Sequence, residues 1–377
     1  MPPRKLRPFG FHKGMQTRRG FLQSTMAAAI ASSASGCGWT LGEIKTTPST
    51  RFSSDTLYIY TWAGYTDRDL LERFTQETGL RVVADVFDSN EAMLARIQAG
   101  GAGAYSIIYP SEYMVQKMVA LGLLAELDHT LIVGLEDLFP KFQNPDYDPN
   151  STYSVPLSWG TTGLIYNSRL LSSSPEDWED LWTYQDQLNR RLTLLNDVRE
   201  VMGASLRRLG YSYNSTNPRE INQAYQELVK LRGAIASFTT DAWRPQMIVG
   251  DLLLAMCYSS DAAEVMPENE DLEYITPVSG SSLWIDTLVI PKSAPNPEGA
   301  YQWINFMLRP DIATQIVERL SFATPSLVAY RQLPQELRED PALFPPESVI
   351  ANSETVSPLP PEITALFDRY WTRLTSG

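Results

Sequence analysis

The nonapeptide LWIDTLVIP at 283–291 places one carboxylate, Asp286, inside an otherwise apolar run. On a strand, Trp284 and Asp286 would point to the same face, because successive side chains alternate. An ionised carboxylate in apolar surroundings is costly unless a partner compensates its charge. Because ammonium groups are attracted to carboxylates and to indole rings alike, we expect Asp286 to lack a protein partner and to receive a bound cation. The alternative is a carboxylate satisfied by backbone amides at a strand bend.

Three further carboxylates stand in contexts that suit a binding site. Asp197 and Glu200, in LLNDVREVMGASLRRLG (194–210), have the i, i+3 spacing that places both on one face of a helical turn. The spacing alone favours a structural interpretation, in which Asp197 is the N-cap and Glu200 its capping-box partner. Asp261 follows the apolar run 251–260, and it too could be an N-cap.

Aromatic side chains accompany these acids at or just beyond predicted strand ends. They are Trp62, Tyr65, Tyr113, Tyr258 and Trp284. Trp303 differs, because its helical spacing with apolar neighbours indicates a core position. Aromatic faces attract ammonium groups and also cover aliphatic chains. Rings combined with carboxylates therefore suit a ligand that alternates methylene chains with ammonium groups, which is the chemical description of a polyamine.

Composition and charge exclude several classes of function. The 377 residues include 31 basic and 44 acidic side chains, and positions 1–37 contain six basic residues and no acid. The remainder thus has a formal charge of −19, which makes nucleic acid a poor partner. Only two histidines (His12, His129) and two cysteines (Cys37, Cys257) occur. Histidine-based zinc sites, catalytic triads, iron–sulfur clusters and a disulfide framework are therefore not expected, and neither is a cofactor.

The basic leader predicts export from the cytoplasm. MQTRRGFLQSTMAAAIASSASGC (15–37) is similar to a twin-arginine signal followed by a short apolar stretch that is too short to span a membrane. Its end, Ala34-Ser35-Gly36-Cys37, resembles a lipobox and predicts lipidation of Cys37; the alternative is ordinary cleavage near Ala34. We expect residues 1–37 to be the export signal, 38–54 a flexible tether, and the protein to be periplasmic, with a lipid anchor as its one membrane contact.

The remaining sequence alternates predicted strands and helices. Strands are expected at 57–62, 80–87 and 105–111, and helices at 67–79 and 89–100. This order predicts a mostly parallel sheet, in which ligands bind near the carboxyl ends of the strands. Residues 62–65, 111–113 and 284–286 would then meet at a candidate cleft. Runs 153–159 and 288–291 lie where the chain could cross between two lobes.

The order and spacing of these segments resemble the bacterial spermidine/putrescine-binding proteins, the extracytoplasmic receptors of polyamine ABC transporters. The resemblance covers about 55–377 and is carried by LYIYTWAGYT, FTQETGLRV, VFDSNEAMLARI, VPLSWGTTGLIYN, NDVREV, SLWIDTLVIPKSAPNPEGAYQWINFMLRPDIA and FATPSLVA. It implies an α/β fold of the two-lobed periplasmic-binding-protein type (type II), with a hinged cleft between two α/β domains. Lobe 1 would comprise 55–160 plus 285–330, and lobe 2 would comprise 165–280 plus 335–377.

The resemblance also implies a polyamine site, an inner-membrane ABC permease as partner, and a monomer. The residues it assigns to the ligand are Trp62, Tyr65, Ser111, Tyr113, Asp197, Glu200, Tyr258, Asp261, Trp284 and Asp286. Tyr258 replaces the Trp usual in the family, and Ser106 replaces an Asp. Gly64 stands where relatives carry an acid that binds one ligand end, and 353–362 offers no match to the Gln of spermidine-type members. The sequence therefore predicts putrescine and/or spermidine as ligand without ranking them.

Two alternatives from other classes remain open at this point. Paired acids could serve a two-carboxylate glycosidase, although no nucleophile motif accompanies them. A receptor of the same fold could bind iron, a sugar or an amino acid instead. Clustered Tyr and His for iron, or an Arg for an amino-acid carboxylate, are not evident among the candidates.

Overall fold

The computed structural model describes residues 55–87 and 89–376. The predicted export signal, Cys37 and the predicted tether lie outside the described residues. Helices occupy α2 Arg68–Thr78, α3 Asn90–Gln98, α4 Glu112–Ala120, α5 Pro140–Gln143, α6 Asp180–Thr183, α7 Gln185–Leu188, α8 Val198–Arg208, α9 Pro218–Leu231, α10 Trp243–Ile248, α11 Ser259–Val265, α12 Pro297–Leu308, α13 Pro310–Leu320, α14 Leu327–Gln332, α15 Gln335–Arg338, α16 Glu347–Asn352 and α17 Pro361–Thr375. Within the described ranges, none of these helices is long and apolar enough to cross a membrane.

Nine strands form the sheet, in the order β2-β1-β3-β9-β4-β7-β5-β6, with β8 also paired to β4. Their bounds are β1 Thr56–Thr61, β2 Arg81–Val86, β3 Ile107–Ile108, β4 Ser154–Asn167, β5 Leu192–Leu194, β6 Ile235–Phe238, β7 Leu254–Tyr258, β8 Leu272–Ile275 and β9 Leu283–Val289. The outer pairs are parallel, as expected for β1 with β2 and β3, and for β5 with β6 and β7. The middle departs from the prediction of a mostly parallel sheet, because β4 pairs antiparallel with β7, β8 and β9.

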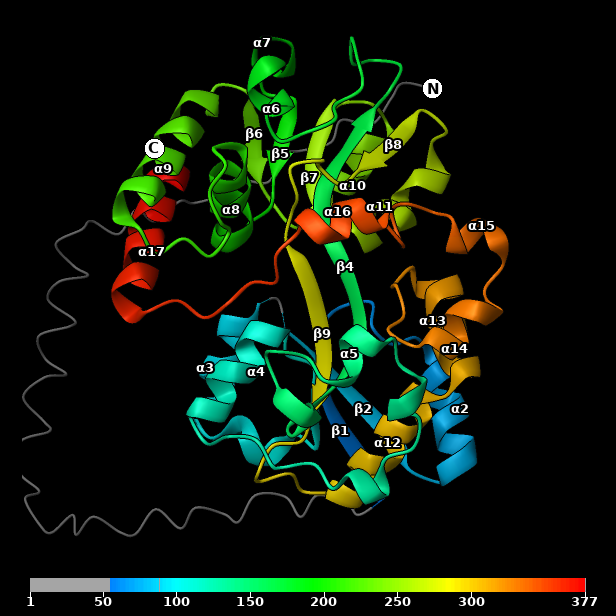
Figure 1. The fold of residues 1–377 in the computed structure, drawn as a ribbon. Coiled ribbons are helices and arrows are strands. Elements are labelled where there is room, and N and C mark those ends of the chain that lie inside the picture. Colours follow the sequence, from blue (N-terminus) through cyan, green and yellow to red (C-terminus); the bar gives the residue numbers. More distant parts are fainter. Residues whose placement is uncertain (1–54, 88, 377) are drawn as a thin grey trace, which may run out of the picture. The chain divides into compact units, whose positions relative to one another are not determined.

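The long central strand β4 connects two hydrophobic cores. Val155 and Trp159 from its first half belong to one core, and Leu164 and Tyr166 from its second half belong to the other. In Figure 1, β4 and β9 run side by side between the two groups of helices. The sequence predicted only 153–159 of this strand, because Gly160 and Gly163 interrupt the residue types that favour strands.

The first helices follow the capping rules from which they were predicted. Asp67 caps α2 by accepting a hydrogen bond from the Leu70 amide at 2.8 Å, and Gly79 ends the helix in the left-handed conformation with φ 77°. Ser89 caps α3 in the same way, accepting from the Ala92 amide at 3.2 Å. The two N-caps therefore fix where the chain turns from β1 into α2 and from β2 into α3, at the carboxyl ends of these strands.

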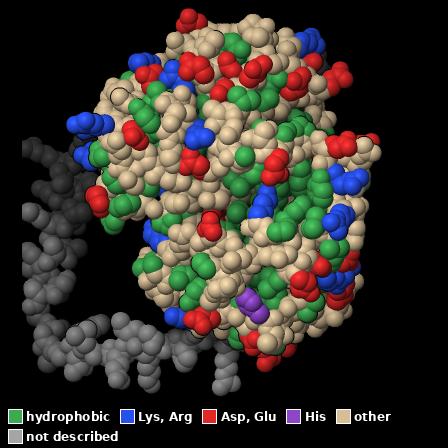
Figure 2. All heavy atoms as spheres, viewed as in Figure 1, with side chains coloured by type: hydrophobic (Ala, Val, Ile, Leu, Met, Phe, Trp, Pro, Cys, Tyr) green, Lys and Arg blue, Asp and Glu red, His purple; other side chains and the backbone are tan. Residues whose placement is uncertain are grey.

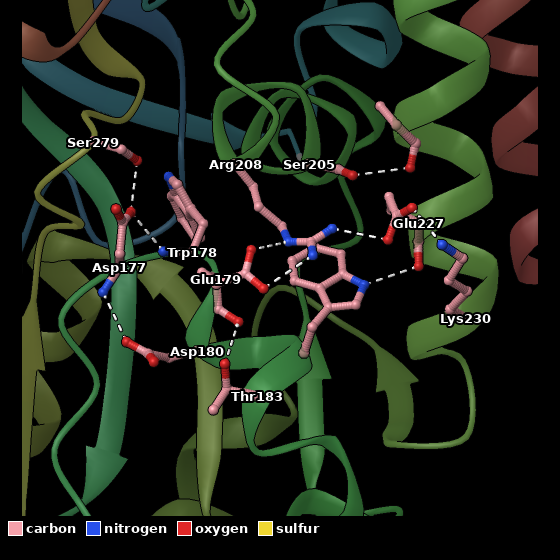
Figure 3. Close-up of polar contacts among 12 residues, drawn as sticks. Asp177, Trp178, Glu179, Asp180, Thr183, Ser205, Arg208, Glu227, Lys230 and Ser279 are labelled. Carbon is pink, nitrogen blue, oxygen red and sulfur yellow. Dashed lines mark hydrogen bonds and ion pairs between the residues drawn. The ribbon is translucent and has the colours of Figure 1, made fainter.

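Helix α8, which carries one candidate carboxylate at its N-cap and one in its first turn, is fixed at its other end. The Arg208 guanidinium lies over the Trp182 ring at 4.2 Å and pairs with Glu179 at 2.6 Å and with Glu227 at 2.9 Å (Figure 3). Arg207 pairs with Glu354 at 2.8 Å. Side-chain hydrogen bonds and stacking of this kind orient a helix more firmly than a lone surface ion pair does.

On the face drawn in Figure 2, acidic and basic side chains are interspersed among uncharged ones. This distribution agrees with the argument that nucleic acid is a poor partner for the chain.

Candidate functional site

Asp286 lies at the middle of β9 and is only 7% exposed. Its Oδ1 accepts a hydrogen bond from Ser111 Oγ at 2.6 Å, and its Oδ2 accepts one from the Tyr65 hydroxyl. The prediction that Asp286 has no protein partner is therefore wrong. Both partners are neutral, however, so they orient the carboxylate without balancing its charge. Burial raises the pKa of Asp286 to about 6, and the hydrogen bonds oppose this shift.

A second layer of polar residues holds the two hydroxyls in place. Ser111 is the N-cap of α4, yet its hydroxyl makes no capping hydrogen bond and is free to donate to Asp286. Asn90 fixes Ser111 from both sides, donating to Ser111 Oγ at 3.0 Å and accepting from the Ser111 amide at 3.1 Å. The Tyr65 hydroxyl lies 2.8 Å from Ser158 Oγ. Sequence reasoning missed Asn90 and Ser158, because neither stands out from its local context.

Asp197 is the N-cap of α8, as the structural interpretation predicted. Its Oδ1 accepts from the Arg199 amide at 2.8 Å and from the Glu200 amide at 3.1 Å. Within the described chain, no hydrogen bond is made to Oδ2. Burial raises the pKa of Asp197, and Arg199 opposes the shift. The Arg199 guanidinium is itself engaged by the Ser357 carbonyl and Asn214 Oδ1, at 2.9 and 3.0 Å.

Glu200 does not complete a capping box. Its carboxylate, on a residue only 5% exposed, faces the Ser282 hydroxyl at 2.7 and 2.9 Å. Burial and then the charge of Asp197 raise the pKa of Glu200 to about 7. The half-buried Asp197 and the buried Glu200 repel one another, which favours a cation between or beside them. The signal that could have identified Ser282 is its place directly before the LWIDTLVIP strand.

Tyr258 at the end of β7 and Trp284 on β9 come together across the intervening strand β4. Their ring centroids are 6.0 Å apart and their planes meet at 81°. Trp62 packs on Phe87 with centroids 4.4 Å apart. The indole nitrogens of Trp62 and Trp284 are buried without a hydrogen-bond partner among the described residues. Such unsatisfied donors border a site that a ligand or water completes.

Asp261 has a protein counter-ion. It lies inside α11, whose N-cap is Tyr258, so the N-cap alternative for Asp261 is wrong. Its Oδ1 is 2.7 Å from the Arg244 guanidinium. Burial raises the pKa of Asp261 to about 6, opposed by Arg244. Asp261 is therefore less available to a cationic ligand than Asp286 is.

Tyr113 points to an acid that sequence reasoning missed. Its hydroxyl donates to Glu91 Oε1 at 3.2 Å. Glu91 is exposed, but partial desolvation of its carboxyl group, and next the charge of Asp197, raise its pKa. Glu91 thus adds negative charge on the α3 side of the same group of residues. It was overlooked because an acid in the first turn of a helix is ordinary.

Glu112, between Ser111 and Tyr113, was also missed. It is 1% exposed, and its two oxygens accept from the Ile285 amide at 3.0 Å and the Val356 amide at 3.2 Å. Burial raises the pKa of Glu112 to about 8, against these hydrogen bonds. Glu112 thereby joins α4 to β9, one residue before Asp286, and to the C-terminal segment.

These residues form a partly buried acidic and aromatic group that suits an organic cation. In residues 55–87 and 89–376, no three His, Cys, Asp or Glu side chains are grouped as a metal site would need. The carboxylates are held by hydroxyls and amides, while rings line the same region. The arrangement can bind ammonium groups and cover a hydrocarbon chain between them.

Comparisons with known proteins agree with this chemistry. Residues 69–345 match the family model described as bacterial extracellular solute-binding protein. The spermidine/putrescine-binding periplasmic protein of Salmonella typhimurium (strain LT2) is 37% identical over 86% of this chain and 92% of its own length. This is a family of solute-binding proteins, so the prediction that the chain is not an enzyme is confirmed and the glycosidase alternative is set aside.

Two solved structures show the same fold. The substrate-binding protein PotD of a spermidine/putrescine ABC transporter from Streptococcus pneumoniae is 37% identical, with a TM-score of 0.77 over 85% of this chain and 99% of that one. The TpPotD lipoprotein of Treponema pallidum is 25% identical, with a TM-score of 0.77 over 86% of this chain and 100% of that one. The predicted α/β periplasmic-binding-protein fold is thus confirmed. The chain belongs to the spermidine/putrescine-binding family of bacterial extracellular solute-binding proteins.

Proposed function

We propose that the protein captures a polyamine, putrescine and/or spermidine, outside the cytoplasm and delivers it to an inner-membrane ABC permease. One observation carries the proposal: Asp286 is a buried carboxylate with two neutral hydroxyl partners, two residues from a buried tryptophan. A buried charge without a counter-ion favours a ligand that supplies one. The relatives from Salmonella typhimurium and Streptococcus pneumoniae support this choice of ligand, since their names give spermidine and putrescine.

The ligand binds through several weak and a few strong contacts. One ammonium group pairs with Asp286, and another pairs with Asp197 and Glu200. The rings of Trp62, Trp284 and Tyr258 cover the methylenes between them. Two or three desolvated ion pairs together with this burial are enough for a micromolar dissociation constant, which corresponds to about −8 kcal/mol.

Closure around the ligand requires two lobes that move relative to one another. We assign 55–160 plus 285–330 to lobe 1 and 165–280 plus 335–377 to lobe 2. Supporting this division, one core draws on residues in 57–159 and 285–323, the other draws on residues in 164–256 and 363–374, and β4 contributes to both. Bending of β4 and β9 at their shared segment would open and close the site.

The leader is assigned to twin-arginine export, with Cys37 as the lipidated residue after processing. The Treponema pallidum relative, which is a lipoprotein, supports a lipid anchor. Replacing Cys37 by Ser should move the exported protein from the membrane fraction to the soluble periplasmic fraction. An unchanged membrane fraction would contradict the assignment.

Thermal unfolding with a set of amines tests the proposed function. Putrescine, cadaverine, spermidine and spermine are each added to the purified protein, with magnesium and lysine as cationic controls. A polyamine at a hundred times its dissociation constant should add about 2.7 kcal/mol of stability. No shift with any polyamine, or an equal shift with magnesium, would contradict the proposal.

A further inference from the structure

Gly160 lies on the central strand β4 directly opposite Trp284 of β9. The pair is in antiparallel register, Gly160 with Trp284, and two residues further along β4 the partner of Thr162 is Tyr258 of β7. Strand β4 therefore runs between the two strands that carry the Trp284 and Tyr258 rings. Residues opposite one another in such a ladder have side chains on the same face.

The indole of Trp284 occupies the space that a side chain at position 160 would need. A Cβ atom added to Gly160 would lie 2.2 Å from Cζ2 and 2.7 Å from Cη2 of Trp284. It would also lie 2.6 Å from Ser259 Oγ. Contacts below 3.0 Å are essentially never made by real Cβ atoms. The six-membered edge of the indole thus lies directly on the β4 backbone.

Space rather than backbone conformation explains this glycine. Gly160 does not have the positive φ that favours glycine elsewhere in the chain, as at Gly64 and Gly79. Within a strand, glycine weakens local structure and is associated with close approach by another group. At Gly160 the approaching group is the Trp284 ring.

The neighbours of the ring leave it little freedom to move aside. Ser259 Oγ accepts a hydrogen bond from the Thr161 amide at 3.2 Å, which fixes the hydroxyl on one side of Gly160. The Tyr258 ring meets the indole at 81° on the same side of the sheet. Trp284 is 9% exposed, and Asp286 is two residues along the same strand face. The contact with the Gly160 backbone therefore fixes the position of the Trp284 ring relative to the Asp286 carboxylate.

We propose that Gly160 is a positioning residue for ligand specificity, which seats the Trp284 indole against β4 so that the ring faces a hydrocarbon chain whose ammonium group pairs with Asp286. A side chain at position 160 lifts the ring into the ligand's space. The inference deepens the proposed function, because it rests on polyamine binding at Asp286. It adds a determinant that contacts no ligand itself.

A double-mutant cycle with Gly160→Ala and Trp284→Phe tests the inference. Phenylalanine lacks the Cζ2 and Cη2 atoms that meet the added methyl group, so it relieves the clash. We expect G160A to weaken spermidine and putrescine binding at least tenfold in calorimetry, and W284F to weaken it less. Addition of G160A to W284F should then change the affinity less than threefold, since residues in contact are not additive.

Near-UV circular dichroism without ligand gives a second readout. G160A should change the tryptophan bands, and the change should disappear in the W284F background. Gly299→Ala is the matched control, because its Cβ would meet the Asn296 side chain at 2.7 Å, at the start of α12. We expect G299A to lower the melting temperature without altering affinity.

The outcomes separate this inference from the proposed function. If the wild-type protein binds no polyamine, the proposed function is wrong. The near-UV circular dichroism of G160A with and without W284F still shows whether Gly160 determines the position of the Trp284 ring. If the wild type binds but G160A binds equally well while folded, the inference is overturned. Equal losses from G160A in both backgrounds would also overturn it, because the effect would then not act through Trp284.

Discussion

At the scale of single residues, Asp286 shows how a buried charge can be oriented without being neutralised. Ser111 and Tyr65 donate one hydroxyl each, and Asn90 and Ser158 hold these hydroxyls in turn. A charged partner such as Arg would have supplied a counter-charge, as Arg244 does for Asp261. The hydroxyl set keeps the carboxylate in place and leaves its charge for a ligand.

Replacing Asp286 by Asn should remove this charge while keeping the shape of the side chain. We expect the variant to lose at least about 2 kcal/mol of polyamine binding, because the ligand's ammonium group is left without its partner. Titration calorimetry measures the loss, and circular dichroism checks the fold. The control is Asp186→Asn on the exposed face of α7, which makes the same charge change outside the site. Unchanged affinity in D286N would return Asp286 to a purely structural role.

The raised pKa values of Asp286 and Glu200 connect binding to pH. Both folded carboxyl groups hold a proton more tightly than they do in the unfolded chain, whose values are about 4. Their contribution to the stability of the ligand-free protein is therefore present below about pH 4 and is lost as the pH rises through about 6 for Asp286 and about 7 for Glu200. An ammonium ligand selects the ionised form, so affinity should rise over the same interval.

This dependence is measured by calorimetry in two buffers of different ionisation enthalpy. We expect binding near pH 6 to release protons and to be weaker at pH 5 than at pH 8. Putrescine is the ligand of choice here, because both of its primary ammonium groups stay charged throughout this range, so the change reports on the protein. If the affinity does not change between pH 5 and pH 8 and no protons are released, these carboxyl groups do not contact the ligand.

Much of the candidate site was predictable from residue types, and the rest was not. Asp286 beside Trp284 violates the apolar pattern of its strand, which makes it visible in the sequence. Asn90, Ser158 and Ser282 are ordinary polar residues that gain importance only from partners far away in the chain. Their roles require the fold to be known.

At the scale of elements, Glu112 links three segments at one point. From the first turn of α4, its two oxygens receive backbone amides from β9 and from the C-terminal segment. The backbone of Glu354 pairs the same C-terminal segment with the start of β9. The Glu354 amide donates to the Ser281 carbonyl at 2.9 Å, and the Glu354 carbonyl accepts from the Leu283 amide at 2.8 Å. The strand that carries Asp286 is therefore braced on both sides.

Glu112→Gln should destabilise the protein by about 1–3 kcal/mol, because an amide nitrogen cannot accept a hydrogen bond and one buried backbone N–H is left unsatisfied. Chemical denaturation measures the change. Glu362→Gln serves as control, since Glu362 is also an acid in the first turn of a helix but is exposed. We expect the control to stay within about 0.5 kcal/mol. Equal stability of E112Q and E362Q would argue against the bracing role.

Elements with local signals were predicted well. Helices α2 and α3 carry their own caps, so their ranges agree with the expected 67–79 and 89–100 within a few residues. The second half of β4 was missed because Gly160 and Gly163 lie in it. Gly160 leaves room for the Trp284 ring, and Gly163 leaves room for the Ile275 carbonyl and the Tyr274 ring. Local propensity cannot reveal these contacts with distant segments.

At the scale of the whole molecule, the negative charge and the arrangement of the site both favour a cationic ligand. A formal charge of −19 beyond residue 37 attracts cations in general, while the buried acids and rings select a shape. The resemblance of the ordered motifs predicted the family and the fold correctly. The return of the C-terminal segment to β9 and α4 could not be predicted, because no local pattern marks it.

The most direct test compares two ligands of equal length by titration calorimetry of the purified protein at pH 7.5. Putrescine and 4-aminobutanoate share a four-carbon frame, but the second has a carboxylate in place of one ammonium group. We predict one-to-one binding of putrescine or spermidine with a micromolar or lower dissociation constant, about −8 kcal/mol or better. Binding of 4-aminobutanoate should be at least a hundredfold weaker, because its carboxylate would face Asp197 and Glu200 or Asp286. No heat with any polyamine, or equal affinity for 4-aminobutanoate, would contradict a site built for two ammonium groups.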